Sequence, residues 1–275
     1  TILGMDLASG GHLSHGASVN TSGAWFDAHT YGVDKDGMLD YASIMEQAIK
    51  VKPKMIIAGA SAYPRQIKWH EFRKIANEVD ALLMVDMAHY SGLIAGGVYD
   101  SPIGIADVVT STTHKTLRGP RGGIILWDNP DYTRKINSAI FPGTQGGPLM
   151  HIIAAKAQSF IEADTPEYEA YARDVVRNAK AMCDVFRQRD IPVQTNGTDS
   201  HIILMDLSDS KHSGREAADL LEDNGITVNK NGVPNDPRSF VETSGIRLGT
   251  AAETTRGHDE MWFRLLAHKI ANILE

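Results

Sequence analysis

Short apolar runs without polar alternation recur along the first half of the chain, and they constrain its fold most. They alternate with stretches in which apolar residues recur at helical spacing. Strands of this kind are typical of a mainly parallel sheet that helices cover on both faces, so the fold class predicted is α/β. The predicted strands are 1–5, 55–58, 81–85, 108–110 and 123–127, and the predicted helices are 41–49 and 69–79.

The second half of the chain has longer helical stretches and fewer, more widely spaced strands. This pattern predicts a smaller α+β domain, joined to the first near residues 160–167. We therefore assign residues 1–163 to a large domain and residues 164–275 to a small C-terminal domain. The predicted helices here are 149–163, 168–186, 217–221 and 265–273, and the predicted strands are 201–205, 226–228 and 245–248.

The charge balance argues against a nucleic-acid or membrane surface. The chain has 27 Lys and Arg against 34 Asp and Glu, a net charge of −7, and no basic block. No apolar run approaches the roughly 18–20 residues of a membrane span. The single cysteine, Cys183, cannot form an internal disulfide and fits a reducing compartment such as the cytoplasm.

Polar residues follow several of the predicted strands, at the end where α/β proteins bind ligands. Ser61 follows strand 55–58, Asp86 and His89 follow strand 81–85, and the segment 111–115 follows strand 108–110. The segment 10–16, which contains three glycines and two histidines, follows the opening strand. These segments are therefore expected to meet at one edge of the sheet.

Lys115 and Asp86 together fit the requirements of a pyridoxal phosphate (PLP) enzyme. A lysine between a strand end and a glycine-rich turn can project into a cleft, where burial lowers its pKa and favours a nucleophilic amine. PLP enzymes also need a carboxylate opposite the pyridine nitrogen. Lys115 would then carry PLP as a Schiff base. Taken singly, a solvated loop lysine and a helix-capping aspartate remain open.

The histidines allow a metal site as a competing interpretation. Imidazole and carboxylate groups suit several divalent ions. The spacing lacks the helical i, i+4 context of zinc proteases, so we predict no metal site and expect a histidine to stack on the PLP ring. The residues concerned are His12, His15, Asp86, His89 and His114.

Two further elements fit an amino-acid substrate and a phosphorylated cofactor. The glycine-rich segment 141–148 precedes a predicted helix, and backbone N–H groups at a helix start favour a phosphate. Arg247 lies in an apolar strand and needs an anion, such as an α-carboxylate. On its own, Arg247 fits an internal salt bridge nearly as well.

Together these segments closely resemble the serine hydroxymethyltransferase family, PLP enzymes of the aspartate-aminotransferase-like fold. The matching motifs run in the family's order and span nearly the whole chain. They are 10–16, 85–89, 112–115, 119–123, 141–148, 228–231, 234–237 and 244–247.

The resemblance implies a role for each matching residue around PLP. Lys115 would hold the cofactor covalently, Asp86 would pair with the pyridinium nitrogen, and His12 would stack on the ring. Ser61 and His89 would contact the 3′-oxygen side of the ring. The implied catalytic residues are Lys115, Asp86, His114 and His89, with His114 shaping the selectivity of the reaction.

Further implied contacts concern the cofactor set, the substrates and a second subunit. Thr112 belongs to the cofactor-binding set, and Arg247 would bind the substrate carboxylate. Gly147 would reach the phosphate of the neighbouring subunit's PLP, which implies a homodimer or higher oligomer. Arg121 lies in a matching motif within the substrate-binding set, and we expect it only to brace the lysine loop. His12 also belongs to the substrate-binding set, and the folate site would be lined by Leu7, Gly11, Leu13, Asn231, Ser239, Phe240 and Val241.

The implied reaction is serine plus tetrahydrofolate giving glycine and 5,10-methylenetetrahydrofolate. In the family a segment precedes the position of Thr1 and carries a proton-transfer glutamate, tyrosines and a phosphate loop. We expect that this upstream segment is missing here. The alternatives are a folate-independent enzyme of threonine-aldolase type and a PLP-binding fragment with little activity. The segment from Asn231 to Val241 argues against the aldolase.

Overall fold

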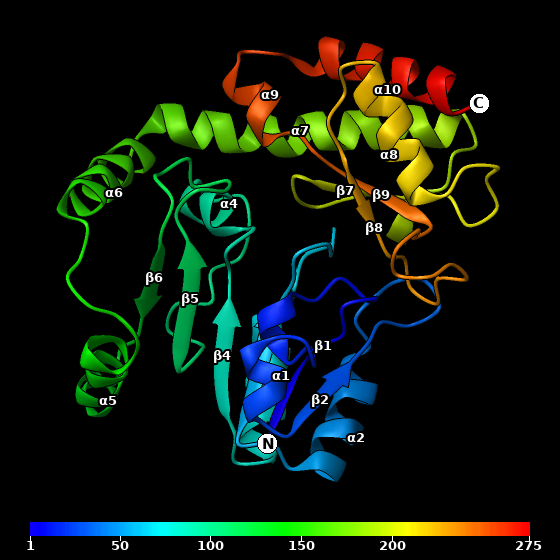
Figure 1. Ribbon diagram of the computed structural model, residues 1–275. Coiled ribbons are helices and arrows are strands. Elements are labelled where there is room, and N and C mark those ends of the chain that lie inside the picture. Colours follow the sequence, from blue (N-terminus) through cyan, green and yellow to red (C-terminus); the bar gives the residue numbers. More distant parts are fainter.

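The computed structural model describes residues 1–275 and contains two sheets (Figure 1). The larger sheet has six strands in the order β2-β1-β3-β4-β5-β6, and only β6 runs antiparallel to its neighbour. The prediction of a mainly parallel sheet is therefore confirmed. Its strands are β1 (Ile2–Met5), β2 (Ala28–Tyr31), β3 (Met55–Gly59), β4 (Leu82–Asp86), β5 (Val108–Thr112) and β6 (Gly123–Leu126).

The sequence did not reveal β2, which forms one edge of the larger sheet. Only Tyr31 of its four residues is buried, so the strand has no apolar run to mark it. The structure adds it through parallel pairing with β1, in the register Ile2 to Ala28. Hydrogen bonding rather than hydrophobicity defines this edge.

Four helices of the first half connect successive strands of the larger sheet, and two more follow its last strand, β6. The α2 helix starts where the Asp40 carboxylate accepts the N–H groups of Ala42 and Ser43, which satisfies two donors that the first turn cannot pair. The helices are α1 (Thr21–Trp25), α2 (Tyr41–Val51), α3 (Trp69–Glu78), α4 (Ser91–Ala95), α5 (Thr133–Ser138) and α6 (Met150–Ala163), with 3-10 turns at Leu13–His15 and Pro130–Tyr132 and a π-helical turn at Ala139–Thr144.

The second sheet has three antiparallel strands in the order β7-β9-β8: β7 (Ile202–Asp206), β9 (Gly245–Gly249) and β8 (Asn229–Asn231). The strand predicted at 226–228 is wrong by three residues. Ile226 and Val228 pack against the apolar core beside this sheet, whereas the ladder with β9 begins only at Asn229, opposite Arg247.

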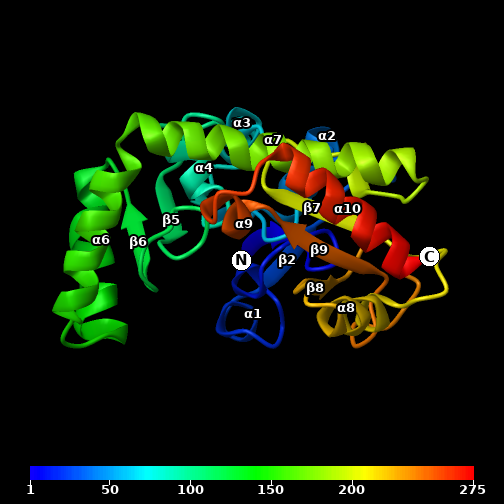
Figure 2. The same cartoon turned by 90° about the horizontal axis from the view of Figure 1, so that it is seen from above.

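The long helix α7 (Pro166–Gln188) crosses the molecule and packs against both halves (Figure 2). Its N-terminal part, including Tyr168 and Val175, belongs to a first core around β1 and β3–β5. Its C-terminal part, including Ala179 and Phe186, belongs to a second core with β7, β9 and α10. The other helices are α8 (Gly214–Asp223), α9 (Ala251–Thr255) and α10 (Glu260–Leu274), with a 3-10 turn at Gln194–Asn196.

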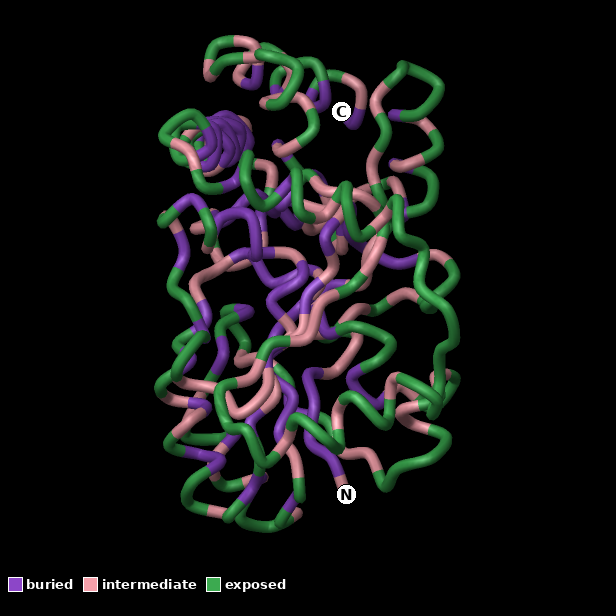
Figure 3. Tube along the Cα trace, turned by 90° about the vertical axis from the view of Figure 1, so that its left-hand side faces the viewer, coloured by how far each residue is buried: buried purple, intermediate pink, exposed green.

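Buried residues run through the middle of the molecule and along α7 (Figure 3). Because one helix contributes to both cores, the division at residue 164 stays a prediction. None of the helices combines the length and the apolar character that a membrane crossing requires.

Candidate active site

The carboxyl ends of β4 and β5 bring Asp86 and Lys115 to the same edge of the larger sheet. Asp86 is the last residue of β4, and Lys115 lies three residues beyond β5, which pairs in parallel with β4. The turn that holds Lys115 is fixed by Thr113. Its hydroxyl donates to the Pro120 carbonyl at 2.6 Å, and its backbone carbonyl accepts the Gly119 N–H at 2.6 Å.

The Lys115 amine is half-buried between charges of opposite sign. Burial lowers its pKa, the Asp86 carboxylate partly offsets this, and the Arg247 guanidinium lowers the pKa further. A lysine with a lowered pKa has a larger neutral fraction, which is the nucleophilic form.

Asp86 is held as an anion by His15. Its Oδ2 lies 3.0 Å from His15 Nε2, and its Oδ1 accepts the Ala88 N–H at 3.0 Å. Burial alone would raise the pKa of Asp86, but the hydrogen bond from His15, the Ala88 N–H and the charge of Lys115 together lower it. Because His15 Nδ1 accepts the His12 N–H, the ring hydrogen is on Nε2 and points at the carboxylate.

His15 is a residue that sequence analysis considered only as a metal ligand. Ligand atoms of His12, His15 and Asp86 lie within 4.8 Å of one another. His89 and His114 are not part of that group. The sequence feature that could have pointed to His15 is its position three residues after His12 in the same glycine-rich loop. A short 3-10 turn there places both side chains near β4.

His12 and His89 have different surroundings. His12 is exposed, its Nδ1 lies 2.7 Å from Ser14 Oγ, and its ring centroid lies 5.6 Å from that of His15. His89 stacks on His201 of the second half, with centroids 5.7 Å apart and planes 12° apart. Burial, followed by the charges of Lys115 and His201, lowers the pKa of His89 well below its usual value.

Several buried polar atoms at this edge have no partner within the chain. They are Thr112 Oγ1, His89 Nδ1, His114 Nδ1 and His201 Nδ1. Buried polar groups are normally hydrogen-bonded, so these four atoms are available to a ligand; four other buried polar atoms without a partner lie elsewhere in the chain. Thr112, His89 and His114 were predicted as site residues, whereas His201, more than 100 positions beyond His89, gave no signal in the sequence.

Arg247 and Ser61 meet across the two halves of the molecule. Arg247 Nη1 donates to the Ser61 carbonyl at 2.8 Å, and Nη2 donates to Asn229 Oδ1 at 3.1 Å. Both acceptors are neutral, so the guanidinium keeps its full charge and three of its five N–H donors. Arg247 makes no internal salt bridge, which removes the alternative that the sequence left open.

The predicted folate residues divide into two groups. Leu7, Leu13 and Phe240, together with His12, line a pocket of about 390 Å³ beside the His12 loop. Gly11, Asn231, Ser239 and Val241 do not line it. At Gly11 a Cβ would lie 2.0 Å from the Met5 carbonyl oxygen, so the glycine is required for close backbone packing.

Arg121 does not brace the lysine loop, which corrects the sequence-based expectation. It is exposed and its side chain donates no hydrogen bond, because Thr113 holds that loop instead. Gly147 is also exposed, and nothing lies within 4 Å of the position of a Cβ there. The structure therefore does not bring Gly147 together with the other site residues.

Comparisons with known proteins identify the family of this chain. A sequence model described as "Serine hydroxymethyltransferase" matches residues 1–270. The chain is 55% identical over 276 residues to the serine hydroxymethyltransferase of Paramagnetospirillum magneticum, and 54% identical over the same length to those of Rhodospirillum centenum and Rickettsia akari. Each alignment covers 100% of this chain but only 65%, 64% and 66% of the relative, which is just under two thirds. The chain belongs to the serine hydroxymethyltransferase family.

Proposed function

We propose that the protein containing this chain transfers the hydroxymethyl group of serine to tetrahydrofolate, with PLP as cofactor, giving glycine and 5,10-methylenetetrahydrofolate. The observation that carries the proposal is the position of the Lys115 amine. It is half-buried and lies within the electrostatic influence of an ionised Asp86 and an Arg247 guanidinium that has free N–H donors.

The residues present fit PLP. The ring nitrogen requires a carboxylate that stays ionised, and the His15 hydrogen bond supports that state of Asp86. The unpartnered Thr112 Oγ1 and His89 Nδ1 are available to polar atoms of the cofactor. When bound, PLP supplies an electrophilic carbon for amines and a ring that accepts electrons from a substrate carbanion.

The side chains of this chain would carry out the other steps. The lowered pKa of Lys115 favours a neutral amine that attacks a carbonyl carbon. Asp86 would hold a proton on the ring nitrogen, which keeps the ring electron-poor. Arg247 would fix the substrate carboxylate through its free N–H groups, and so orient the serine side chain. His114 would influence which substrates react, and His12 would stack on the ring.

The pocket beside His12 supports tetrahydrofolate as the second substrate. Its lining by Leu7, Leu13 and Phe240 suits a flat aromatic group, and it adjoins His12 at the edge that carries Lys115. A folate-independent aldolase has no use for such a pocket. Gly11, Asn231, Ser239 and Val241 remain proposed folate contacts, Arg121 remains a proposed substrate contact, and Ser61 and His89 remain proposed contacts of the 3′-oxygen side of PLP.

The assembly and location are also proposals. An exposed Gly147 is compatible with a contact to PLP of a second subunit, so we propose a homodimer or higher oligomer. A cytoplasmic location is in keeping with the single, buried Cys183.

The test uses the full-length protein, because the chain spans just under two thirds of its relatives. Purified protein with PLP should convert serine to glycine only when tetrahydrofolate is present. The Lys115→Ala variant should lose the visible absorbance of lysine-bound PLP. Release of glycine from 3-hydroxy amino acids without folate, and none from serine with folate, would instead identify the aldolase. An undiminished absorbance band in Lys115→Ala would contradict the assignment of the lysine.

A further inference from the structure

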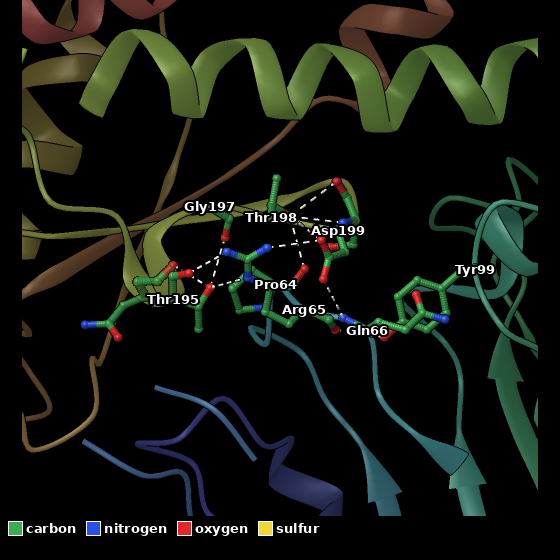
Figure 4. Close-up of polar contacts among 10 residues, drawn as sticks. Pro64, Arg65, Gln66, Tyr99, Thr195, Gly197, Thr198 and Asp199 are labelled. Atoms are coloured by element: carbon green, nitrogen blue, oxygen red, sulfur yellow. Dashed lines mark hydrogen bonds and ion pairs between the residues drawn. The ribbon is translucent and has the colours of Figure 1, made fainter. Parts of the chain in front are cut away.

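A cluster of polar contacts around Arg65 ties the segment after Ser61 to the loop before β7 (Figure 4). We call this cluster the Arg65 clasp. It consists of Pro64, Arg65, Gln66, Thr195, Thr198 and Asp199.

The guanidinium of Arg65 contacts two residues of the second half. Nη1 lies 3.1 Å from Asp199 Oδ1, and Nε donates to Thr195 Oγ1 at 3.1 Å. Nη2 donates to the backbone carbonyl of Thr195. A planar guanidinium makes such a set of bonds in a fixed geometry, which a lysine cannot reproduce.

Backbone groups lock the same two segments together. The Asp199 N–H donates to the Pro64 carbonyl at 3.0 Å, and the Gln66 N–H donates to Asp199 Oδ2 at 3.2 Å. Thr198, which is 3% exposed, donates to the Pro64 carbonyl through its hydroxyl. The clasp is therefore a set of reciprocal contacts and not an isolated surface ion pair.

The loop that Arg65 contacts, residues 195–199, precedes β7, and β7 pairs with the strand that contains Arg247. The loop continues into β7, and Leu204 of β7 pairs with Arg247 of β9. Val193, just before the clasp, forms an isolated bridge to Met205 of the same strand. A shift of this loop would consequently move the backbone of Arg247.

Arg247 also contacts the segment that contains Arg65. Its Nη1 donates to the Ser61 carbonyl, four residues before Arg65. Ser61 is itself fixed to the first half, because its N–H donates to the Gly10 carbonyl at 2.8 Å. The position of the guanidinium relative to Lys115 thus depends on two attachments, one at Ser61 and one at Arg65.

We propose that Arg65 is a positioning residue that sets the location of the Arg247 guanidinium, and with it the affinity for the substrate carboxylate. This inference rests on the proposed function, because it requires Arg247 to bind that carboxylate. The backbone of Arg65 has separate support, since Tyr99 donates to its carbonyl at 3.0 Å and accepts the Ile67 N–H at 2.9 Å. Changing the Arg65 side chain therefore loosens the clasp without releasing the segment.

The test introduces Arg65→Lys and, separately, Asp199→Asn into the full-length PLP-loaded protein. Serine and glycine binding is measured by calorimetry, and kcat and KM are measured with tetrahydrofolate. Both variants should bind the amino acids about tenfold more weakly and raise KM, with kcat changed less than twofold. The PLP content and absorbance should match those of the unmodified protein.

The matched control is Arg73→Lys. Arg73 Nη1 lies 2.7 Å from Asp107 Oδ2, and the Arg73 and Asp107 side chains are 23% and 25% exposed, against 24% and 37% for Arg65 and Asp199. The control pair lies wholly within the first half. Arg73→Lys should lower the melting temperature about as much as Arg65→Lys and leave serine binding unchanged.

Hydrogen exchange gives a readout that does not depend on catalysis. The amides of Gln66 and Asp199 donate within the clasp, so they should exchange faster in Arg65→Lys and not in Arg73→Lys. Wild-type serine affinity in Arg65→Lys, or an equal loss in Arg73→Lys, would overturn the positioning role alone. Failure of the unmodified protein to bind serine would contradict the proposed function, and the positioning role with it.

Discussion

The two ends of the candidate site are built in different ways. Asp86 and Lys115 follow neighbouring strands of one sheet, and His15, Ala88 and Thr113 hold them through contacts inside the first half. Arg247 belongs to the second sheet and reaches the first half through a hydrogen bond to the Ser61 carbonyl. The end proposed to hold the cofactor is thus built from contacts within one core, whereas the end proposed to bind the carboxylate depends on the alignment of two cores.

If this contrast is correct, a change at the first end should affect chemistry more than substrate binding. Asp86→Asn in the full-length enzyme should lower kcat by about a hundredfold or more, because a neutral amide cannot hold a proton on the ring nitrogen. Serine binding, measured by calorimetry, should change little, and PLP should remain bound. An unchanged kcat would remove Asp86 from this role.

A change at the second end should have the opposite profile. Arg247→Lys should weaken serine binding roughly a hundredfold, since the lysine loses the planar pair of N–H donors and the anchor at Ser61. The absorbance of lysine-bound PLP should be unaffected. If Arg247→Lys instead lost PLP while serine affinity held, the assignment of the two ends would have to be exchanged.

The contact between the halves at His89 and His201 should make stability depend on pH. Burial lowers the pKa of His201 to about 3, whereas an unfolded histidine titrates near pH 6.5. Between these values the unfolded chain binds the extra proton, so stability falls as pH falls below about 6.5. His201 alone contributes about 2 kcal/mol of loss between pH 6.5 and pH 5, and His89 acts in the same direction.

The measurement is urea unfolding at pH 6.5 and pH 5. His201→Phe keeps a planar ring and cannot titrate, so it should reduce the difference in stability between the two pH values and leave the contribution of His89. His258→Phe is the control, because His258 also stacks on an aromatic ring, that of Trp262, but is about one-third exposed. Equal pH slopes for His201→Phe and the unmodified protein would contradict the buried, neutral state of His201.

The smallest expected effect lies at the pocket beside His12. Phe240→Ala should weaken tetrahydrofolate binding about two- to fivefold and leave serine binding unchanged, because Phe240 lines the pocket but is 75% exposed. Phe160→Ala is the control, since Phe160 is an exposed phenylalanine of α6 that does not line the pocket. Calorimetric titration with tetrahydrofolate distinguishes them, and equal affinities would place the folate elsewhere.

The same contrast explains how much of the site could be predicted from the sequence. Asp86 and Lys115 lie at or shortly after the ends of neighbouring apolar strands, so the rule for parallel strands predicted that they lie at the same edge of the sheet. The stack of His89 on His201 and the anchor of Arg247 at Ser61 join segments far apart in the chain. No local pattern records such pairings, because they depend on how the two sheets are placed.

In the fold, too, some elements could be predicted from the sequence and others could not. Buried strands such as β3 and β4 were visible as apolar runs, but the edge strands β2 and β8 were not, since most of their residues are partly or fully exposed. For Arg121, in contrast, the sequence predicted a contact that the structure does not contain. Its motif suggested a brace, yet the backbone contacts of Thr113 already fix the turn and leave the guanidinium in solvent.

The continuous helix α7 has a mechanical consequence for substrate capture. Its 23 residues extend about 35 Å, and there is no flexible linker between the part that packs on the first core and the part that packs on the second. A hinge needs a few residues that absorb large backbone rotations, and a regular helix offers none. We therefore expect any closure of the second sheet over the proposed amino-acid substrate to proceed by shear, with side chains sliding along α7 in small steps.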